Sequence, residues 1–180
     1  MDTEIVEANG KKFAPYISEE EILQGVERVA KEISRDFKGK NPLLVVILKG
    51  AFMFASDLMK RLDFPCEVSF VKLSSYVGDV STGRIKEHLP LGDSVEGRNV
   101  IVIEDIVDTG ATMRYFINHL KELGTQEVKL ASFLIKPHRM DKGVKVDYFV
   151  REIADEFVIG YGLDFDQVGR NLRNIYQAVD

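Results

Sequence analysis

Two acidic residues followed by a short polar turn are the part of this sequence best suited to chemistry. Glu104 and Asp105 follow an apolar run that begins at Val100, and a turn comes next: Asp108, Thr109, Gly110, Ala111 and Thr112. The turn offers small side chains, hydroxyls and the free N–H groups of a helix start, which together suit a phosphate. The carboxylates would repel phosphate, so they suit sugar hydroxyls or a hydrated Mg²⁺. A diol, a phosphate and a metal describe a phosphorylated ribose.

Regular elements on both sides hold this segment in place. The apolar, β-branched run over 100–104 is typical of a central strand, and a helix is predicted from about 111 to 123. Upstream, Ser18 and Glu21 form a capping-box pattern that predicts an amphipathic helix over 19–37. The remaining predicted elements are strands over 43–48, 66–73, 84–89 and 128–135 and a helix near 51–62.

Alternation of strands and helices predicts the fold class, which is α/β. We expect a doubly wound, mostly parallel sheet that is flanked by helices and connected by right-handed crossovers. Ligands bind such sheets beyond the carboxyl ends of the strands, so the segments that follow strands should meet at one edge. These segments are Lys49-Gly50, the polar loop 74–84, the turn 104–112 and Lys136. The chain reads as one domain over 1–180, with a core at about 17–135 and a small hood lobe from 1–16 and 136–180.

Composition excludes several classes of protein. With 180 residues, 45% of them hydrophobic and 29% charged, the chain has an ordinary globular composition. The net charge of −5 disfavours a nucleic-acid partner. The single cysteine, Cys66, indicates a reducing compartment and reads as a small buried hydrophobe. Without a signal core or an apolar run near the ~20 residues of a membrane span, we expect a cytoplasmic protein with no membrane partner.

Several common motifs are missing from the sequence. It contains no Walker A motif, no Gly-x-Gly-x-x-Gly after a strand and no Gly-x-Ser-x-Gly. His88, His119 and His138 lack metal-ligand spacing. These absences disfavour a P-loop enzyme, a dinucleotide-binding fold and a serine hydrolase.

The segment 100–113 resembles the phosphoribosyl diphosphate (PRPP) signature of type I phosphoribosyltransferases. Further segments occur in the order found in the hypoxanthine-guanine phosphoribosyltransferase branch of that family. They are Leu48-Lys49-Gly50, Ser75-Tyr76, Lys136-Pro137-His138-Arg139, residues 157–165, and Gly169-Arg170-Asn171-Leu172. The resemblance covers roughly residues 40 to 176 and implies the type I phosphoribosyltransferase fold.

For the donor, the resemblance implies that residues 108–112 bind the 5′-phosphate through backbone N–H groups and the hydroxyls of Thr109 and Thr112. It implies that Glu104 and Asp105 face the ribose hydroxyls, directly or through Mg²⁺, and that Asp108 acts as a general base near N7 of the purine. Plainer interpretations are a helix start with Asp108 as its cap and a pair of solvated carboxylates.

For pyrophosphate, the resemblance implies binding by Lys49 and Gly50, at a turn where the family often has a non-proline cis peptide bond. Arg139 and Arg170 would also bind pyrophosphate, since guanidinium groups suit phosphate oxygens. Ser75 and Tyr76 would contact it from the loop 74–84, which would close over the site and exclude water. The alternatives are an ordinary turn and solvated charges.

For the purine, the resemblance implies that Lys136 donates to the 6-oxygen, Phe157 stacks on the ring and the Val158 backbone contacts the base edge. Asp164 resembles a purine-site residue that also holds a second Mg²⁺. A surface lysine, a pair of core strand residues and a turn residue are the alternatives. Arg151 and Ala154, which lie in the predicted hood lobe, depart from the family pattern.

The resemblance implies purine salvage by Mg²⁺-dependent transfer of 5-phosphoribosyl from PRPP to N9 of hypoxanthine or guanine. It also implies a homodimer or a homotetramer. One alternative is a phosphoribosyltransferase that prefers xanthine, and another is a PRPP-sensing regulatory protein of the same fold that contacts nucleic acid. The acidic balance and the presence of Lys49, Asp108 and Asp164 favour an enzyme.

Overall fold

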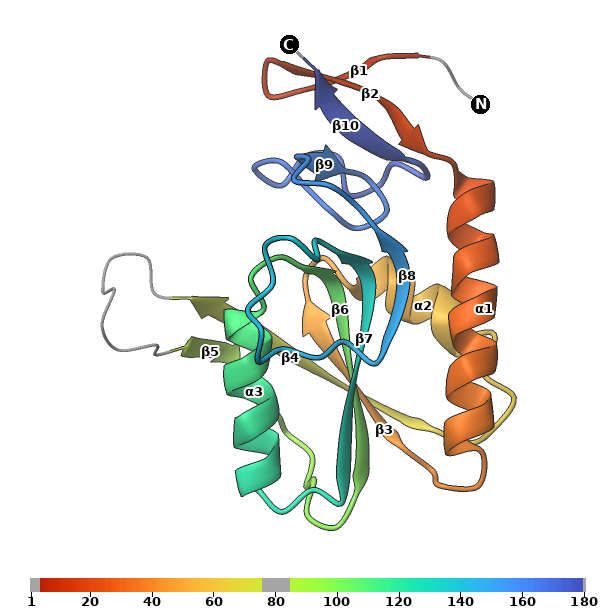
Figure 1. Ribbon diagram of the computed structural model, residues 1–180, viewed down its shortest axis with the longest axis vertical. Coiled ribbons are helices and arrows are strands. Elements are labelled where there is room, and N and C mark those ends of the chain that lie inside the picture. The colour runs from red at the N-terminus through yellow and green to blue at the C-terminus, as the bar shows by residue number, and fades with distance from the viewer. Residues whose placement is uncertain (1–3, 76–84, 180) are drawn as a thin grey trace.

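The computed structural model describes residues 4–75 and 85–179, which form two sheets connected by α1 (Glu19–Phe37) (Figure 1). The larger sheet contains, in spatial order, β5 (Ile85–Leu89), β4 (Glu67–Ser75), β3 (Leu43–Leu48), β6 (Asn99–Val107), β7 (Glu127–Ile135) and β8 (Tyr148–Glu152). Its neighbouring strands are parallel except for β4 and β5. The predicted α/β class with a mostly parallel sheet is therefore confirmed.

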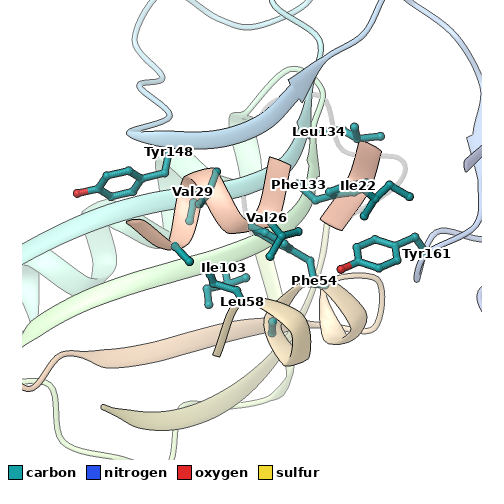
Figure 2. Close-up of a cluster of buried hydrophobic side chains, with 14 of the residues drawn as sticks. Ile22, Val26, Val29, Phe54, Leu58, Ile103, Phe133, Leu134, Tyr148 and Tyr161 are labelled. Atoms are coloured by element: carbon teal, nitrogen blue, oxygen red, sulfur yellow. The ribbon is translucent and has the colours of Figure 1, made fainter. Parts of the chain in front are cut away.

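Helices cover both faces of this sheet. α1 and α2 (Phe52–Met59) pack on one face, whereas α3 (Ala111–Glu122) packs on the other (Figure 1). Figure 2 shows the first of these interfaces, where side chains of the two helices meet those of the sheet. Its labelled members from α1, α2 and β6 are Ile22, Val26, Val29, Phe54, Leu58 and Ile103. Helices on both faces are the reason that the central strands are apolar on both sides.

The start of α1 is fixed by the predicted capping box. The Glu21 N–H donates to Ser18 Oγ at 3.3 Å, and the Ser18 N–H donates to Glu21 Oε2 at 2.9 Å. Apolar residues then recur at helical spacing along the buried side of α1. The predicted helix over 19–37 is confirmed at both ends, and Gly39 follows it with φ of 84°.

A second, four-stranded sheet lies beyond the carboxyl edge of the first (Figure 1). It contains, in spatial order, β1 (Val6–Ala8), β2 (Lys11–Ile17), β10 (Ile175–Val179) and β9 (Val158–Ile159), which are antiparallel. Tyr161 anchors this sheet to the core, because its ring is 4.8 Å from that of Phe133 and its hydroxyl donates to Asp57 at 2.7 Å. The sheet thus joins the two ends of the chain.

The hood lobe predicted over 1–16 and 136–180 differs from this sheet in one element. β8 lies within 136–180, yet it pairs in parallel with β7 in the larger sheet. Sequence pattern missed this strand because an irregular segment of polar residues and a Pro-containing turn separates it from β7.

Three other predicted boundaries differ from the structure. The strand predicted over 100–104 extends over 99–107, because pairing with β7 continues to Val107 and Ile135. The helix predicted near 51–62 ends at Met59, where turn-type hydrogen bonds replace the helical ones. The predicted loop begins later than 74, since β4 continues to Ser75. Residues 76–84 lie outside the described part of the chain.

Cys66 is partly buried against the cluster between α1, α2 and the sheet. Burial raises the pKa of its thiol, so the protonated form that suits a small hydrophobe is favoured. Among the described helices, none combines the length and the apolar composition needed to cross a membrane.

The substitution Ser18→Ala is expected to lower the free energy of unfolding by about 1 kcal/mol at pH 7, because the cap of α1 is lost. Hydrogen bonds from Ser18 lower the pKa of Glu21 from 4.5 to about 2, so stabilisation by the ionised carboxylate is present above pH 4.5 and is lost as the pH falls toward 2. Urea unfolding at pH 7 and pH 3 measures both effects. Ser56→Ala, at an exposed position of α2, is the control. An equal loss of unfolding free energy in both variants would contradict the assignment of Ser18 as the cap of α1.

Candidate active site

A cleft of about 490 Å³ opens at the carboxyl ends of β3 and β6. Because these strands are parallel neighbours, the turn after one lies beside the turn after the other. The predicted residues on its lining are Lys49, Gly50, Glu104, Asp105, Asp108, Thr109, Gly110, Ala111 and Thr112. The structure therefore brings together the predicted phosphate turn, the acidic pair and the turn Lys49-Gly50 of the predicted pyrophosphate site.

The helix that follows the phosphate turn starts without a side-chain cap. Its N-cap is Gly110, in the left-handed region with φ of 79°, which has no side chain to cap the helix, and the Ala111 N–H donates to Thr109 Oγ1 at 3.4 Å. The interpretation of Asp108 as the helix cap is therefore wrong. A Cβ at Gly110 would also overlap Val144. The N–H groups of Thr112 and Met113 in the first turn consequently remain available for an anion in the cleft.

Glu104 and Asp105 form a carboxylate pair within the last residues of β6. Glu104 is only 9% exposed, and burial raises its pKa well above the usual range, with a further increase from the Asp105 carboxylate. Backbone N–H groups of Asp105 and Ile106 donate to the two side chains at 3.0 and 2.7 Å. Over residues 4–75 and 85–179, neither carboxylate forms a salt bridge with a lysine or an arginine.

This pair suits Mg²⁺ that arrives with a phosphorylated substrate. No cluster of three His, Cys, Asp or Glu side chains that could enclose a metal exists among the described residues. Proteins commonly hold Mg²⁺ by one or two carboxylates together with substrate phosphates and water. A buried Glu104 beside a half-buried Asp105, without a cationic partner among the described residues, fits that donor set.

Glycines let three segments meet at the floor of the cleft. The peptide bond between Leu48 and Lys49 is cis, within the turn for which such a bond is expected. A Cβ at Gly50 would overlap the Asp105 carboxylate, and a Cβ at Gly162 would overlap the Gly50 carbonyl oxygen. Gly162 also has φ of 100°. The turn at 49–50 therefore lies between the acidic pair and the loop that follows β9.

That loop carries two of the predicted ligand-binding residues, which contact each other. Arg170 Nη2 is 2.6 Å from Asp164 Oδ1, and Arg170 Nη1 donates to the Gly162 carbonyl at 2.8 Å. Lys49 Nζ donates to Gln167 Oε1 of the same loop at 2.9 Å. Asp164 does not line the cleft and forms no metal cluster with Glu104 and Asp105 among the described residues.

A chain of four charged side chains lies at the other end of the phosphate turn. Arg139 Nε donates to Asp108 Oδ1 at 2.5 Å, while Arg139 Nη1 donates to Asp155 Oδ2 at 2.8 Å. The second Asp155 oxygen, Oδ1, accepts from Lys136 Nζ at 3.1 Å. The sequence did not predict a role for Asp155, because a single carboxylate in a polar segment gives no signal.

Phe157 and Val158 lie at the smaller sheet and do not line the cleft. The Phe157 ring is 46% exposed and lies 6.1 Å from that of Phe13 and 5.5 Å from that of Phe165. Lys11 Nζ lies 5.8 Å from its centroid. Neither Phe13 nor Lys11 was predicted to be near the site, since both come from the opposite end of the chain.

Ser75 is the last residue of β4, and its predicted partner Tyr76 lies outside the described residues. Closure of the loop 74–84 over the site therefore stays a prediction.

The chain matches the phosphoribosyl transferase domain family over residues 17–166, and it belongs to that family. Its similarity to named relatives then confirms the predicted resemblance to the hypoxanthine-guanine branch. A hypoxanthine-guanine phosphoribosyltransferase from Streptococcus thermophilus is 39% identical over 156 residues, which cover 86% of this chain and 87% of the relative.

Other relatives differ in length or have known structures. A bifunctional TilS/HprT protein of Listeria innocua is 41% identical over 87% of this chain, but the chain spans only 24% of that protein. A hypoxanthine phosphoribosyltransferase structure from Staphylococcus aureus matches with a TM-score of 0.88 at 36% identity, over 92% of this chain and 90% of that one. A hypoxanthine-guanine phosphoribosyltransferase structure from Bacillus anthracis, with HEPES in its active site, matches with a TM-score of 0.89 at 33% identity, over 98% of this chain and 100% of that one.

The substitution Gly50→Ala is expected to destabilise the protein by about 1–3 kcal/mol, because the added methyl group forces the turn or the Asp105 carboxylate to move. Denaturant unfolding measures the loss, and a crystal structure of the variant locates the displaced group. Gly92→Ala is the matched control, since its Cβ would meet nothing within 4 Å. Equal stability of the two variants would show that the turn and the carboxylate are not in close contact.

Proposed function

We propose that this protein transfers the 5-phosphoribosyl group of PRPP to N9 of hypoxanthine or guanine and releases pyrophosphate. One observation carries the proposal: in a single cleft, a helix start without a side-chain cap lies directly beyond an acidic pair, the buried Glu104 and the half-buried Asp105, that has no cationic partner among the described residues. The first feature suits the 5′-phosphate, and the second suits the ribose hydroxyls and Mg²⁺. Similarity to the named relatives supports the choice of purines.

For the donor, backbone N–H groups of residues 109–112 and the hydroxyls of Thr109 and Thr112 hold the 5′-phosphate in this proposal. Glu104 and Asp105 orient the ribose and hold Mg²⁺. When bound, Mg²⁺ supplies positive charge that stabilises the departing pyrophosphate. Lys49 and the Gly50 backbone bind pyrophosphate from the lining of the cleft, and Arg170 does so from the loop after β9. The resemblance assigns Ser75 and Tyr76 to the same group.

For the acceptor, Lys136 donates to the 6-oxygen of the purine. Adenine presents an amino donor at that position, so the ammonium donor that faces the base would be left without an acceptor, a mismatch that strongly disfavours binding. Phe157 stacks on the ring and the Val158 backbone contacts the base edge. Asp164 completes this side of the site and would hold a second Mg²⁺. The exposed Phe157 ring supports this assignment.

Asp108 handles the proton at N7 while N9 attacks C1′ of the ribose. Its Oδ1 already accepts from Arg139, which leaves Oδ2 for the base. The transition state carries positive charge on the ribose, so a carboxylate beside the reacting atoms is favourable. Arg139 is also assigned to pyrophosphate by the resemblance.

We further propose that the protein works in the cytoplasm as a homodimer or a homotetramer. The single Cys66 supports a reducing compartment, and the resemblance supports self-association.

The test of this function is a spectrophotometric assay with PRPP, Mg²⁺ and each of hypoxanthine, guanine, xanthine and adenine. We expect turnover with hypoxanthine or guanine and release of pyrophosphate without nucleic acid. Preference for xanthine would correct the substrate, and the absence of turnover with every purine would overturn the proposal.

Replacing Asp108 with alanine is expected to lower kcat on the order of 10²-fold, the usual contribution of a positioned acid or base. Steady-state kinetics at saturating PRPP and hypoxanthine measure the effect. The exposed Asp93, changed to alanine, is the control. A kcat near that of the wild-type protein would remove Asp108 from catalysis.

Lys136→Met is expected to lower kcat/KM for hypoxanthine by about 10–100-fold, since it removes a charge-assisted hydrogen bond to the 6-oxygen. It should lower kcat/KM for adenine much less, so the ratio of the two values narrows. Lys121→Met, at an exposed position on α3, serves for comparison. An unchanged ratio would mean that Lys136 does not read position 6.

A further inference from the structure

We infer that Asp155 is a positioning residue for the purine site, which holds Lys136 and Arg139 in place and, through Arg139, orients Asp108. The inference rests on the proposed function and deepens it. It explains how Lys136, which binds the purine, and Asp108, which handles its proton, are held at fixed positions relative to each other.

The geometry assigns each oxygen of Asp155 to a different cation. Oδ1 lies 3.1 Å from Lys136 Nζ, and Oδ2 accepts from Arg139 Nη1 at 2.8 Å. Arg139 uses a second edge of its guanidinium, Nε, to donate to Asp108. Two carboxylates and two cations therefore alternate from Lys136 to Asp108, and their charges balance.

Backbone hydrogen bonds fix the elements that carry these side chains. The Lys136 N–H donates to the Val107 carbonyl at 3.0 Å, and the Arg139 N–H donates to the Lys136 carbonyl at 2.9 Å. On the opposite side, the Ile153 N–H donates to the Ile135 carbonyl at 2.9 Å, two residues before Asp155. Lys136 and Asp108, at the two ends of this charged chain, thus directly follow the neighbouring strands β7 and β6, and the pairing of these strands sets their separation.

Lys136 needs such a partner because its side chain is only 11% exposed. A largely buried ammonium is unfavourable unless it is paired and hydrogen bonded. Within the described residues, Asp155 is the acidic side chain that pairs with it. An ammonium has three donors, so one bond to Asp155 directs the group and leaves the others for an acceptor on the purine.

Asp155 acts on Asp108 through the shape of the guanidinium. This group is planar and presents its donors in a fixed fork, so holding Nη1 also sets the direction of Nε. Asp108 Oδ1 is engaged by that Nε, while no donor among the described residues contacts Oδ2. Asp155 therefore sets which oxygen of Asp108 faces the substrate.

The competing explanation is an ordinary surface ion pair, because Asp155 is 58% exposed. Such pairs contribute little to stability. The pair between Lys38 and Asp63 is a matched control on this protein, with a carboxylate that is 59% exposed and an N–O distance of 2.7 Å. Both carboxylates can be neutralised by substitution with asparagine, so that only their positions differ.

The experiment compares Asp155→Asn, Asp155→Glu and Asp63→Asn with the wild-type protein. We measure kcat, the KM for hypoxanthine at saturating PRPP, the KM for PRPP at saturating hypoxanthine, and the Tm. For Asp155→Asn we expect the KM for hypoxanthine to rise about tenfold, as for a lost charge-assisted hydrogen bond, with the KM for PRPP changed less than about twofold. Asp155→Glu should recover part of the loss, and Asp63→Asn should match the wild-type protein.

The inference is overturned if Asp155→Asn leaves the KM for hypoxanthine unchanged, or if both KM values rise together. A lower Tm with unchanged kcat and unchanged KM values would likewise assign Asp155 to stability alone. A wild-type protein that does not convert hypoxanthine or guanine would overturn the proposed function itself, and that result is distinct from an active wild type with an equally active Asp155→Asn variant.

Discussion

Parallel pairing of β3 with β6 brings the turn after one strand against the carboxylates at the end of the other. The contact is close enough that only a glycine fits at position 50, beside Asp105. Because β6 continues directly into the phosphate turn and α3, this one pairing also places the helix start in the same cleft. The loop after β9 then packs on the opposite side of Gly50 and brings Asp164 and Arg170 nearby.

Charge is distributed unequally across this edge of the sheet. Glu104 and Asp105 have no cationic partner among the described side chains, whereas Asp108, Arg139, Asp155 and Lys136 balance one another. Burying unpaired carboxylates costs free energy, and native proteins retain such groups mainly where they bind something. The balanced group lies beside the unbalanced pair, so one part of the site suits a cation and sugar hydroxyls while the other suits a neutral base.

Much of the larger sheet and most of the cleft could be predicted, because their signals are local. The capping residues of α1, the apolar strands and the contiguous segment 104–112 are all visible in a short window of sequence. The smaller sheet could not be predicted in the same way, since β2 pairs with β10 from the opposite end of the chain. Asp155 was missed for a related reason: its importance comes from two cations that tertiary structure brings to it. The N-cap at Gly110, in place of the alternative cap at Asp108, could not be predicted because a glycine has no polar side chain that would mark it as a cap.

The most direct measurement is a crystal structure of the protein with Mg²⁺ and PRPP, or a non-hydrolysable analogue of it. The account predicts the 5′-phosphate on the backbone N–H groups of residues 109–112, with the ribose hydroxyls facing Glu104 and Asp105. A donor bound elsewhere, with the cleft between Gly50 and the start of α3 empty, would contradict it.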